Sequence, residues 1–350
     1  MHIFCPDPVS SIPLHPLFNF RFTPDHKIEG LFKSNLPPNF FAEKVDYVAT
    51  PEDADVIVLP NNFLMHGQKA REYITRFADV GEKHHKPVFV FSCGDHTDSL
   101  VFDPRVWVFR YSLYKSSMTP RDISMPTLTE DLGALGITLR VKQETPTVSF
   151  CGKADFSSSR ELYAGIIKKV GWELRALFNR KLRARIRGVF WRVWSIRALK
   201  RSNLVKTFFI IRKTFSGAEK TIELDPSVAR KEFIESLVNT DFVLAPKGDG
   251  NYSNRFLEAL SKGRFPVVPD TDCVFSFEDE VQYEKIVVRV PMNEIKKMPQ
   301  FVREFYDSLS AEEFTVRQKL AREIFERYLR QDAFLTHLFT QRLADFQTQK

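Results

Sequence analysis

The stretch FVLAPKGDGNYSNRFLEALSKGRFPVVPD, from Phe242 to Asp270, decides the fold of the second half of this chain. Its apolar start, FVLA, predicts a buried strand, and the run PKGDGNYS predicts a polar loop rich in glycine. The following residues predict a short helix that ends at Gly263, and FPVVP predicts a second buried strand. A strand, a loop, a helix and a strand in this order are typical of an α/β unit.

Working outward, the rest of the chain shows the same alternation. Continuous apolar runs predict buried parallel strands, and apolar residues three or four apart predict helices. Before the central stretch, we expect strands at 54–60, 86–92 and 147–152, a weaker strand at 107–114, and helices at 68–84 and 157–170. After it, we expect a strand at 286–290 and a helical tail that begins at a Ser310–Glu313 capping box. A further helix is expected near 228–240.

The length of 350 residues suits two domains rather than one core. Residues 115–147 are rich in Ser, Thr and Pro and are expected to form a long irregular connection. We therefore predict a Rossmann-like domain over residues 1–145, a second over 146–309, and C-terminal helices over 310–350. The second domain carries a basic insert at 175–213.

The four cysteines, Cys5, Cys93, Cys151 and Cys273, lie far apart and form no metal-binding pattern. This spacing favours reduced thiols and a cytoplasmic protein. The first residues lack the basic and apolar segments of a signal peptide, and no run is apolar enough to span a membrane. We therefore expect a cytoplasmic location, with attachment to the inner face of a membrane as an open alternative.

The loop and helix of the central stretch carry the residues that are suited to ligand binding. A helix N-terminus offers unpaired backbone N–H groups to a diphosphate, and Gly248 and Gly250 let a ligand approach the backbone. Ser253 and Arg255 could bind that diphosphate, and Glu258 could accept from ribose hydroxyls. A structural alternative stays open, in which Ser253 caps the helix, Arg255 faces solvent and Glu258 pairs with Lys262.

The central stretch resembles the donor-site segment of exostosin-type glycosyltransferases, glycosyltransferase family 47. The shared pattern is F-x-L-x-P-x-G, then S-x-R, EAL, a glycine and PV. Three weaker segments follow the family order upstream: ADVIVLP, DISMP at 122–126, and VSFCGK with Arg160. The resemblance covers roughly residues 50–290. The family's membrane anchor and secretory cysteines are missing here, and its pattern does not predict the basic insert.

The resemblance implies a GT-B fold, with two facing Rossmann-like domains, the sugar-nucleotide donor on the second domain and a saccharide acceptor in the cleft. By position, Ser253 and Arg255 would bind the diphosphate, Glu258 the ribose, and Lys247 and Gly248 would line the same pocket. The implied reaction is an inverting transfer from a UDP-sugar, in polysaccharide biosynthesis, without a metal or another cofactor. The alternatives are a non-catalytic nucleotide-sugar or glycan-binding protein, and a basic peripheral membrane or nucleic-acid binding protein.

An inverting transfer needs a general base that deprotonates the acceptor hydroxyl. Asp95 and His96 follow the 86–92 strand, at the edge where open α/β sheets place ligands. We therefore expect the base to be one of them. The alternative is that Asp95 only caps a turn.

The basic insert contains thirteen Lys or Arg and no acidic residue between Arg175 and Lys213. Subtracting these thirteen charges from the net charge of +7 leaves −6 for the remainder. Its cations alternate with aliphatic and aromatic residues, which favours amphipathic helices lying on an anionic membrane surface. A solvated face and an acidic acceptor are the alternatives, and nucleic acid is not expected as a partner because no nucleic-acid fold accompanies the charge.

Overall fold

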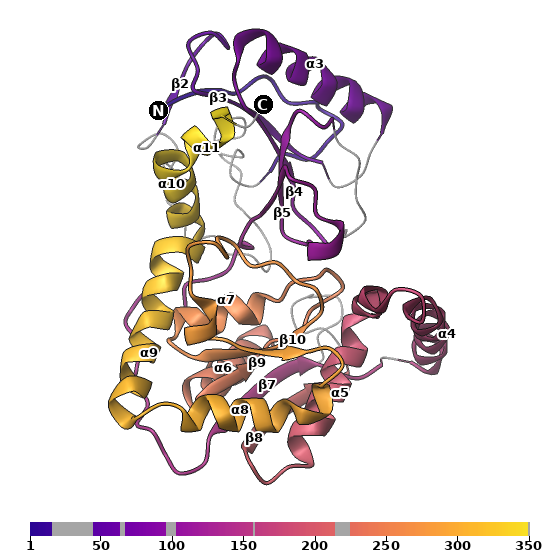
Figure 1. The fold of residues 1–350 in the computed structure, drawn as a ribbon, viewed down its shortest axis with the longest axis vertical. Coiled ribbons are helices and arrows are strands. Elements are labelled where there is room, and N and C mark those ends of the chain that lie inside the picture. Colours follow the sequence, from indigo (N-terminus) through magenta and orange to yellow (C-terminus); the bar gives the residue numbers. More distant parts are fainter. Residues whose placement is uncertain (16–44, 64–66, 96–102, 157, 214–224, 349–350) are drawn as a thin grey trace. The chain divides into compact units, whose positions relative to one another are not determined.

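Two parallel sheets organise the chain, each within its own compact unit (Figure 1). The structure is a computed structural model that describes all residues except 16–44, 64–66, 96–102, 157, 214–224 and 349–350. Unit 1 comprises residues 1–128, 274–277 and 327–350, and unit 2 comprises residues 129–273 and 278–326. The sequence-based domain limits at 145/146 and 309/310 divide the chain differently and stay predictions.

Unit 1 is built on six parallel strands in the order β2-β1-β3-β4-β5-β6. Side chains alternate between the two faces of this sheet, as the period of a strand requires. The strands are His2–Phe4 (β1), Asp46–Tyr47 (β2), Val56–Asn62 (β3), Val88–Ser92 (β4), Trp107–Arg110 (β5) and Asp122–Ser124 (β6).

Helices cover both faces of the unit 1 sheet. Helix α3 (Gln68–His84) packs with Val88 and Val90 on one face. Helices α10 (Gln331–Gln341) and α11 (Leu343–Thr348) pack with Phe89 and other strand residues on the opposite face. This two-sided burial explains why β3 and β4 are continuous apolar runs rather than alternating ones.

Unit 2 is built on five parallel strands in the order β11-β10-β9-β7-β8. The strands are Thr147–Lys153 (β7), Lys206–Arg212 (β8), Phe242–Leu244 (β9), Phe265–Asp270 (β10) and Val288–Pro291 (β11). Its helices are Ser159–Ala176 (α4), Gly188–Lys200 (α5), Pro226–Val238 (α6), Asn254–Ser261 (α7), Met298–Asp307 (α8) and Ala311–Ile324 (α9). The strand, loop, helix and strand expected over 242–270 are therefore β9, the loop 245–253, α7 and β10.

Most predicted elements are confirmed, with two corrections. The capping box of α9 is present, because the Ser310 side chain accepts from the Glu313 backbone and the Glu313 side chain accepts in return. The segment 115–147 was expected to be irregular throughout, yet it contains β6, which pairs with β5. The basic insert was expected to be helical, yet it ends in β8, an edge strand paired with β7. Each strand forms by pairing with an earlier strand, β6 with the nearby β5 and β8 with the distant β7.

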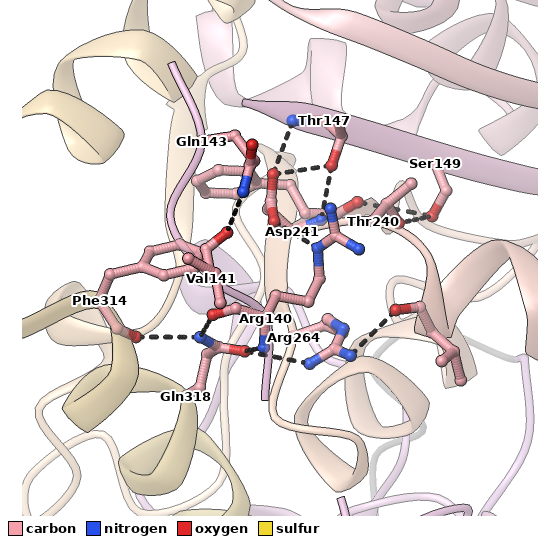
Figure 2. A network of polar contacts seen from close by, with 12 residues as sticks. Arg140, Val141, Gln143, Thr147, Ser149, Thr240, Asp241, Arg264, Phe314 and Gln318 are labelled. Carbon is pink, nitrogen blue, oxygen red and sulfur yellow. Dashed lines mark hydrogen bonds and ion pairs between the residues drawn. The ribbon is translucent and has the colours of Figure 1, made fainter. Parts of the chain in front are cut away.

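A polar network closes the amino ends of β7, β9 and β10 (Figure 2). Asp241 accepts hydrogen bonds from Arg140 Nε at 2.5 Å, Thr147 N at 2.9 Å and Thr147 Oγ1 at 2.7 Å. Arg264 is 1% exposed, and its guanidinium donates to five backbone carbonyls and to Gln318 Oε1. Hydrogen bonds therefore connect the amino ends of these three strands to the segments packed around them.

The predicted α/β class is confirmed, with two Rossmann-like parallel sheets and C-terminal helices, as the GT-B class requires. Among the helices that the structure describes, none combines the length and the hydropathy needed to cross a bilayer.

Candidate functional site

The candidate site lies at the carboxyl ends of β7, β9 and β10, where an open parallel sheet places its ligands. The loop 245–253 connects β9 to α7 there. Gly248 N donates to Tyr252 O at 2.9 Å, which closes the loop on itself. Asn251 and Thr271 exchange two hydrogen bonds, Nδ2 to the Thr271 carbonyl and Thr271 Oγ1 to Asn251 Oδ1. The loop is therefore held in one conformation by its own backbone and by the residue after β10.

The start of α5 packs directly against this loop. A Cβ atom on Gly188 would lie 2.1 Å from the Gly248 carbonyl oxygen and 2.4 Å from the Lys247 carbonyl oxygen. No side chain fits between two backbones at that separation. Gly248 itself has room, because the nearest atom to its Cβ position is Arg192 NH2 at 3.7 Å. The close backbone approach therefore requires glycine at position 188 rather than at 248.

Lys247 belongs to this loop, and its side chain is buried. Its Nζ donates to the Ala184 carbonyl at 2.6 Å. Burial, together with the neighbouring Arg185, lowers the pKa of Lys247 to about 7, and Cys273 and Asp249 oppose that fall. A lysine with this pKa exchanges a proton near neutrality, so its charge responds to an anion placed beside it.

Arg255 is held against the end of β7. Its Nε and NH2 donate to the Cys151 carbonyl at 3.1 and 2.9 Å, and its guanidinium lies 4.8 Å from the centre of the Phe150 ring. Gly152 makes room for it, since a Cβ there would lie 2.1 Å from Arg255 NH2 and the φ of Gly152 is +142°. Burial lowers the pKa of Arg255 from its usual range. Hydrogen bonds to the backbone of β7 therefore fix the orientation of the Arg255 side chain, which does not extend into solvent.

Glu258 lies one turn further along α7 and is buried as well. Its Oε1 accepts from Arg230 NH1 at 3.0 Å, and Arg230 NH2 donates to Glu130 at 2.6 Å. Burial raises the pKa of Glu258, and the ion pair with Arg230 opposes that rise. The expected alternative partner, Lys262, instead donates to the Gly136 carbonyl.

Ser253 is the residue before α7, but its side chain does not cap the helix. Its Oγ is buried and has no hydrogen-bond partner among the residues that the structure describes. A buried hydroxyl without a partner costs free energy, which a ligand oxygen could recover. The structural alternative of a capping serine, a solvated Arg255 and a Glu258–Lys262 pair therefore does not describe this site.

The other predicted residues are placed as follows. Gly250 is buried in the loop, and Asp249 beside it is exposed. Asp95 is exposed and comes three residues after the end of β4 in unit 1. His96 lies outside the described residues. The roles assigned to these residues, to Lys247 and to the α7 residues stay predictions.

Sequence reasoning missed four residues of this neighbourhood: Gly152, Gly188, Arg192 and Arg230. Gly152 belongs to the VSFCGK segment, which marked it as part of the family pattern but did not indicate what it does. Arg192 NH1 donates to the Lys153 carbonyl at 2.9 Å, at the end of β7. No sequence motif pointed to Gly188 or Arg230, because each contacts residues that are distant in the sequence.

Part of the basic insert lies beside the candidate loop. Arg187 NH2 is 4.0 Å from Asp249 and 3.3 Å from Glu161. The apolar side of α5 is buried within unit 2, including Phe190, Trp191 and Ile196. This helix therefore supplies packing and nearby cations, and its apolar residues are buried or half-buried.

A separate cavity of about 550 Å³ lies in unit 1 at the start of α3. Its lining comprises Ser11, Ile12, residues 67–70 and Glu72. None of the predicted site residues is among them, so this cavity does not bear on the chemistry argued from the loop and α7.

Comparison with known proteins bears on the same segment. Residues 180–305 match the family model described as Exostosin GT47 domain, and this match runs from the 3-10 helix η3 (Arg180–Arg185) through most of α8. A 101-residue segment is 29% identical to an Exostosin-1 homolog from Caenorhabditis elegans. That match covers 29% of this chain and 25% of the relative, so the chain aligns with about a quarter of that protein. The exostosin-like character predicted from the sequence is therefore confirmed for this region.

Solved structures show a more general likeness. The lipopolysaccharide outer core galactosyltransferase WaaB, in its apo form, has a TM-score of 0.41 at 11% identity, over 97% of this chain and all of that one. HepE from Anabaena, in complex with UDP and glucose, has a TM-score of 0.36 at 10% identity, over 99% and 100%. Values this low carry no argument about function.

Proposed function

We propose that this chain is an inverting glycosyltransferase that moves a sugar from a nucleoside diphosphate, UDP, to a saccharide hydroxyl. The observation that carries the proposal is the start of α7 in the exostosin-like segment. There a half-buried Arg255 comes two residues after Ser253, whose hydroxyl has no hydrogen-bond partner within the described structure.

Charge development in the reaction explains these residue types. When the bond between the anomeric carbon and the diphosphate oxygen breaks, the departing UDP takes the electron pair and gains negative charge. Arg255, the hydroxyl of Ser253 and the amino end of α7 would stabilise that charge, which is the usual source of large rate effects. Lys247 would add a proton-dependent charge beneath the loop. These groups support a transfer that does not need a metal ion.

Glu258 is the group proposed to bind the ribose. Its carboxylate is held by Arg230, which fixes the orientation of the side chain before a ligand arrives. A carboxylate that is already oriented loses little conformational entropy on binding. Loss of Glu258 should therefore weaken binding of UDP more than binding of inorganic pyrophosphate.

The general base is proposed to be Asp95 or His96. The base takes the proton of the acceptor hydroxyl as its oxygen attacks the anomeric carbon, and a single displacement inverts that carbon. Asp95→Asn should lower kcat while leaving the thermal shift with UDP unchanged. Turnover near that of the wild type in this variant would leave His96 as the candidate.

We also propose an acceptor and a location for this chain. A saccharide hydroxyl in polysaccharide biosynthesis, on a free or lipid-linked glycan, is supported by the exostosin-like segment. A cytoplasmic location is supported by the four cysteines, which are buried and form no disulfide bond with one another.

A thermal-shift panel of nucleotides tests the proposal directly, because a ligand that binds only the folded chain raises its melting temperature. UDP and UDP-sugars should stabilise the wild type, and UMP should do so less. Arg255→Ala should remove the shift, whereas Arg303→Ala should keep it, because Arg303 is a half-buried arginine on α8 outside the candidate site. A transfer assay with and without EDTA then follows. No shift with any nucleotide would overturn the proposal, and a shift without transfer would indicate a binding protein instead.

A further inference from the structure

Helix α4 presents a broad apolar face to solvent. Along the helix and the two residues after it, large apolar side chains are between 39% and 94% exposed. They are Leu162, Tyr163, Ile166, Ile167, Val170, Leu174, Leu177 and Phe178. Isolated exposed apolar residues need no explanation, but a contiguous group of this size marks an interaction surface.

The spacing of these residues places them on one side of the helix. Leu162, Ile166, Val170, Leu174 and Phe178 follow one another at intervals of four, and the others fall between the same turns. This is the pattern of a helix that buries one face. In the described structure, however, that face meets solvent.

The opposite side of α4 holds the helix to unit 2. The Cβ position of Gly165 lies 3.1 Å from the Phe156 ring and 3.6 Å from the Phe190 ring. Lys169 Nζ lies 5.5 Å from the centre of the Trp194 ring. Helix α4 is thus anchored by its small and polar side, and it lies beside the unit 2 sheet rather than on it (Figure 1). Its apolar side needs another partner.

The charges around this face are cationic. Both acidic residues of the segment 159–181 are already ion-paired: Glu161 with Lys153 and Arg187, and Glu173 with Lys169 and Arg183. The exposed cations of the same segment are Arg160, Lys168, Arg175, Arg180 and Lys181.

We propose that the exposed face of α4 and residues 177–181 lies in the interface of an anionic lipid bilayer. The apolar side chains would enter the acyl boundary, and the cations would lie at the level of the headgroups. Charge complementarity favours lipid over a second copy of this chain, since two copies of α4 would bring the same cations together. The proposed contact differs from the one expected from the sequence, which was the basic insert 175–213, because α5 within that insert buries its apolar side in unit 2. It does not depend on the glycosyltransferase proposal.

Sedimentation with vesicles tests this surface. The full chain should bind vesicles of 70% phosphatidylcholine and 30% phosphatidylserine, and should bind pure phosphatidylcholine at least tenfold more weakly. Ile167→Glu with Leu174→Glu, both 58% exposed, should weaken binding at least tenfold. The matched control is Val316→Glu on α9, which is 60% exposed and should bind like the wild type.

A second variant separates folding from binding. Lys168→Gln with Arg175→Gln and Lys181→Gln keeps the apolar face and should lower binding to anionic vesicles severalfold, with a weaker salt dependence. Melting temperature and the thermal shift with UDP should match the wild type in every variant. Absence of binding to anionic vesicles at low salt would overturn the proposal. So would binding unchanged by the Glu substitutions, or a dimer that those substitutions dissolve.

Discussion

The two edges of the unit 2 sheet are built differently. At the amino edge, Asp241 accepts hydrogen bonds from Arg140 and Thr147, and Arg264 donates to backbone carbonyls around it (Figure 2). At the carboxyl edge, the Ser253 hydroxyl has no partner in the described structure, and the pKa of Lys247 is lowered by burial. Unsatisfied and perturbed groups persist where a ligand compensates them. We infer that the amino edge contributes stability and the carboxyl edge contributes binding.

The largest expected effect on stability is at the amino edge. Asp241→Ala should lower the free energy of unfolding by about 3 kcal/mol, because it removes a buried carboxylate and leaves the half-buried Arg140 and the Thr147 donors without their acceptor. Urea denaturation measures this. The control is Asp307→Ala, which removes an exposed ion pair with Arg303 and should cost less than about 1 kcal/mol. Equal losses of unfolding free energy in the two variants would show that the Arg140–Asp241 pair stabilises the fold no more than the exposed Arg303–Asp307 pair does.

The largest expected effect on activity is at the carboxyl edge. Arg255→Ala should reduce kcat/KM with a UDP-sugar by about 100-fold, as loss of one charge-stabilising group does. Steady-state kinetics measure this, and the stability loss should be smaller than that of Asp241→Ala. A variant with normal kcat/KM would show that Arg255 serves the fold alone.

Gly152→Ala should affect both properties. The φ of +142° makes any side chain strained, at a cost of about 1–3 kcal/mol, and the added Cβ would displace Arg255. Gly136→Ala is the control, because Gly136 also has a positive φ, of +100°, but has open space at its Cβ position. Both variants should unfold at lower urea, and only Gly152→Ala should weaken UDP binding. Equal UDP affinity in the two would remove the link to Arg255.

The lowered pKa of Lys247 predicts a pH effect on binding. Folding moves this pKa from 10.5 to about 7, so the folded chain holds Lys247 mainly neutral between those values. A bound diphosphate favours the ammonium form, so UDP binding at pH 8 should take up close to one proton, and affinity should fall as the pH rises above 7. Calorimetry in buffers of different ionisation enthalpy measures the uptake. Uptake that persists in Lys247→Met would assign it elsewhere.

The smallest expected effect concerns two serines that precede helices. Ser310 caps α9, so Ser310→Ala should cost about 1 kcal/mol. Ser253 does not cap α7, so Ser253→Ala should change the free energy of unfolding by less than about 0.5 kcal/mol while weakening UDP binding. Urea denaturation and a UDP titration compare them. A cap-sized loss in Ser253→Ala would restore the capping interpretation.

Much of the fold and part of the site could be predicted from the sequence because their signals are local. The apolar runs at β3 and β4, the Ser310–Glu313 box and the order of elements over 242–270 each lie within a few residues. Strands β6 and β8 could not be predicted, since each forms only by pairing with a strand that other segments position.

The sequence by itself determined that Ser253, Arg255 and Glu258 follow a glycine-rich loop at the start of a helix. Only the tertiary structure decided that Arg255 is held at the Cys151 carbonyl and Glu258 by Arg230, about 104 and 28 residues away along the chain. It also decided that α5 is buried and that the apolar face of α4 is exposed. Both helices carry apolar and basic residues, and burial depends on which face meets a neighbour, a relation between distant segments that periodicity does not contain.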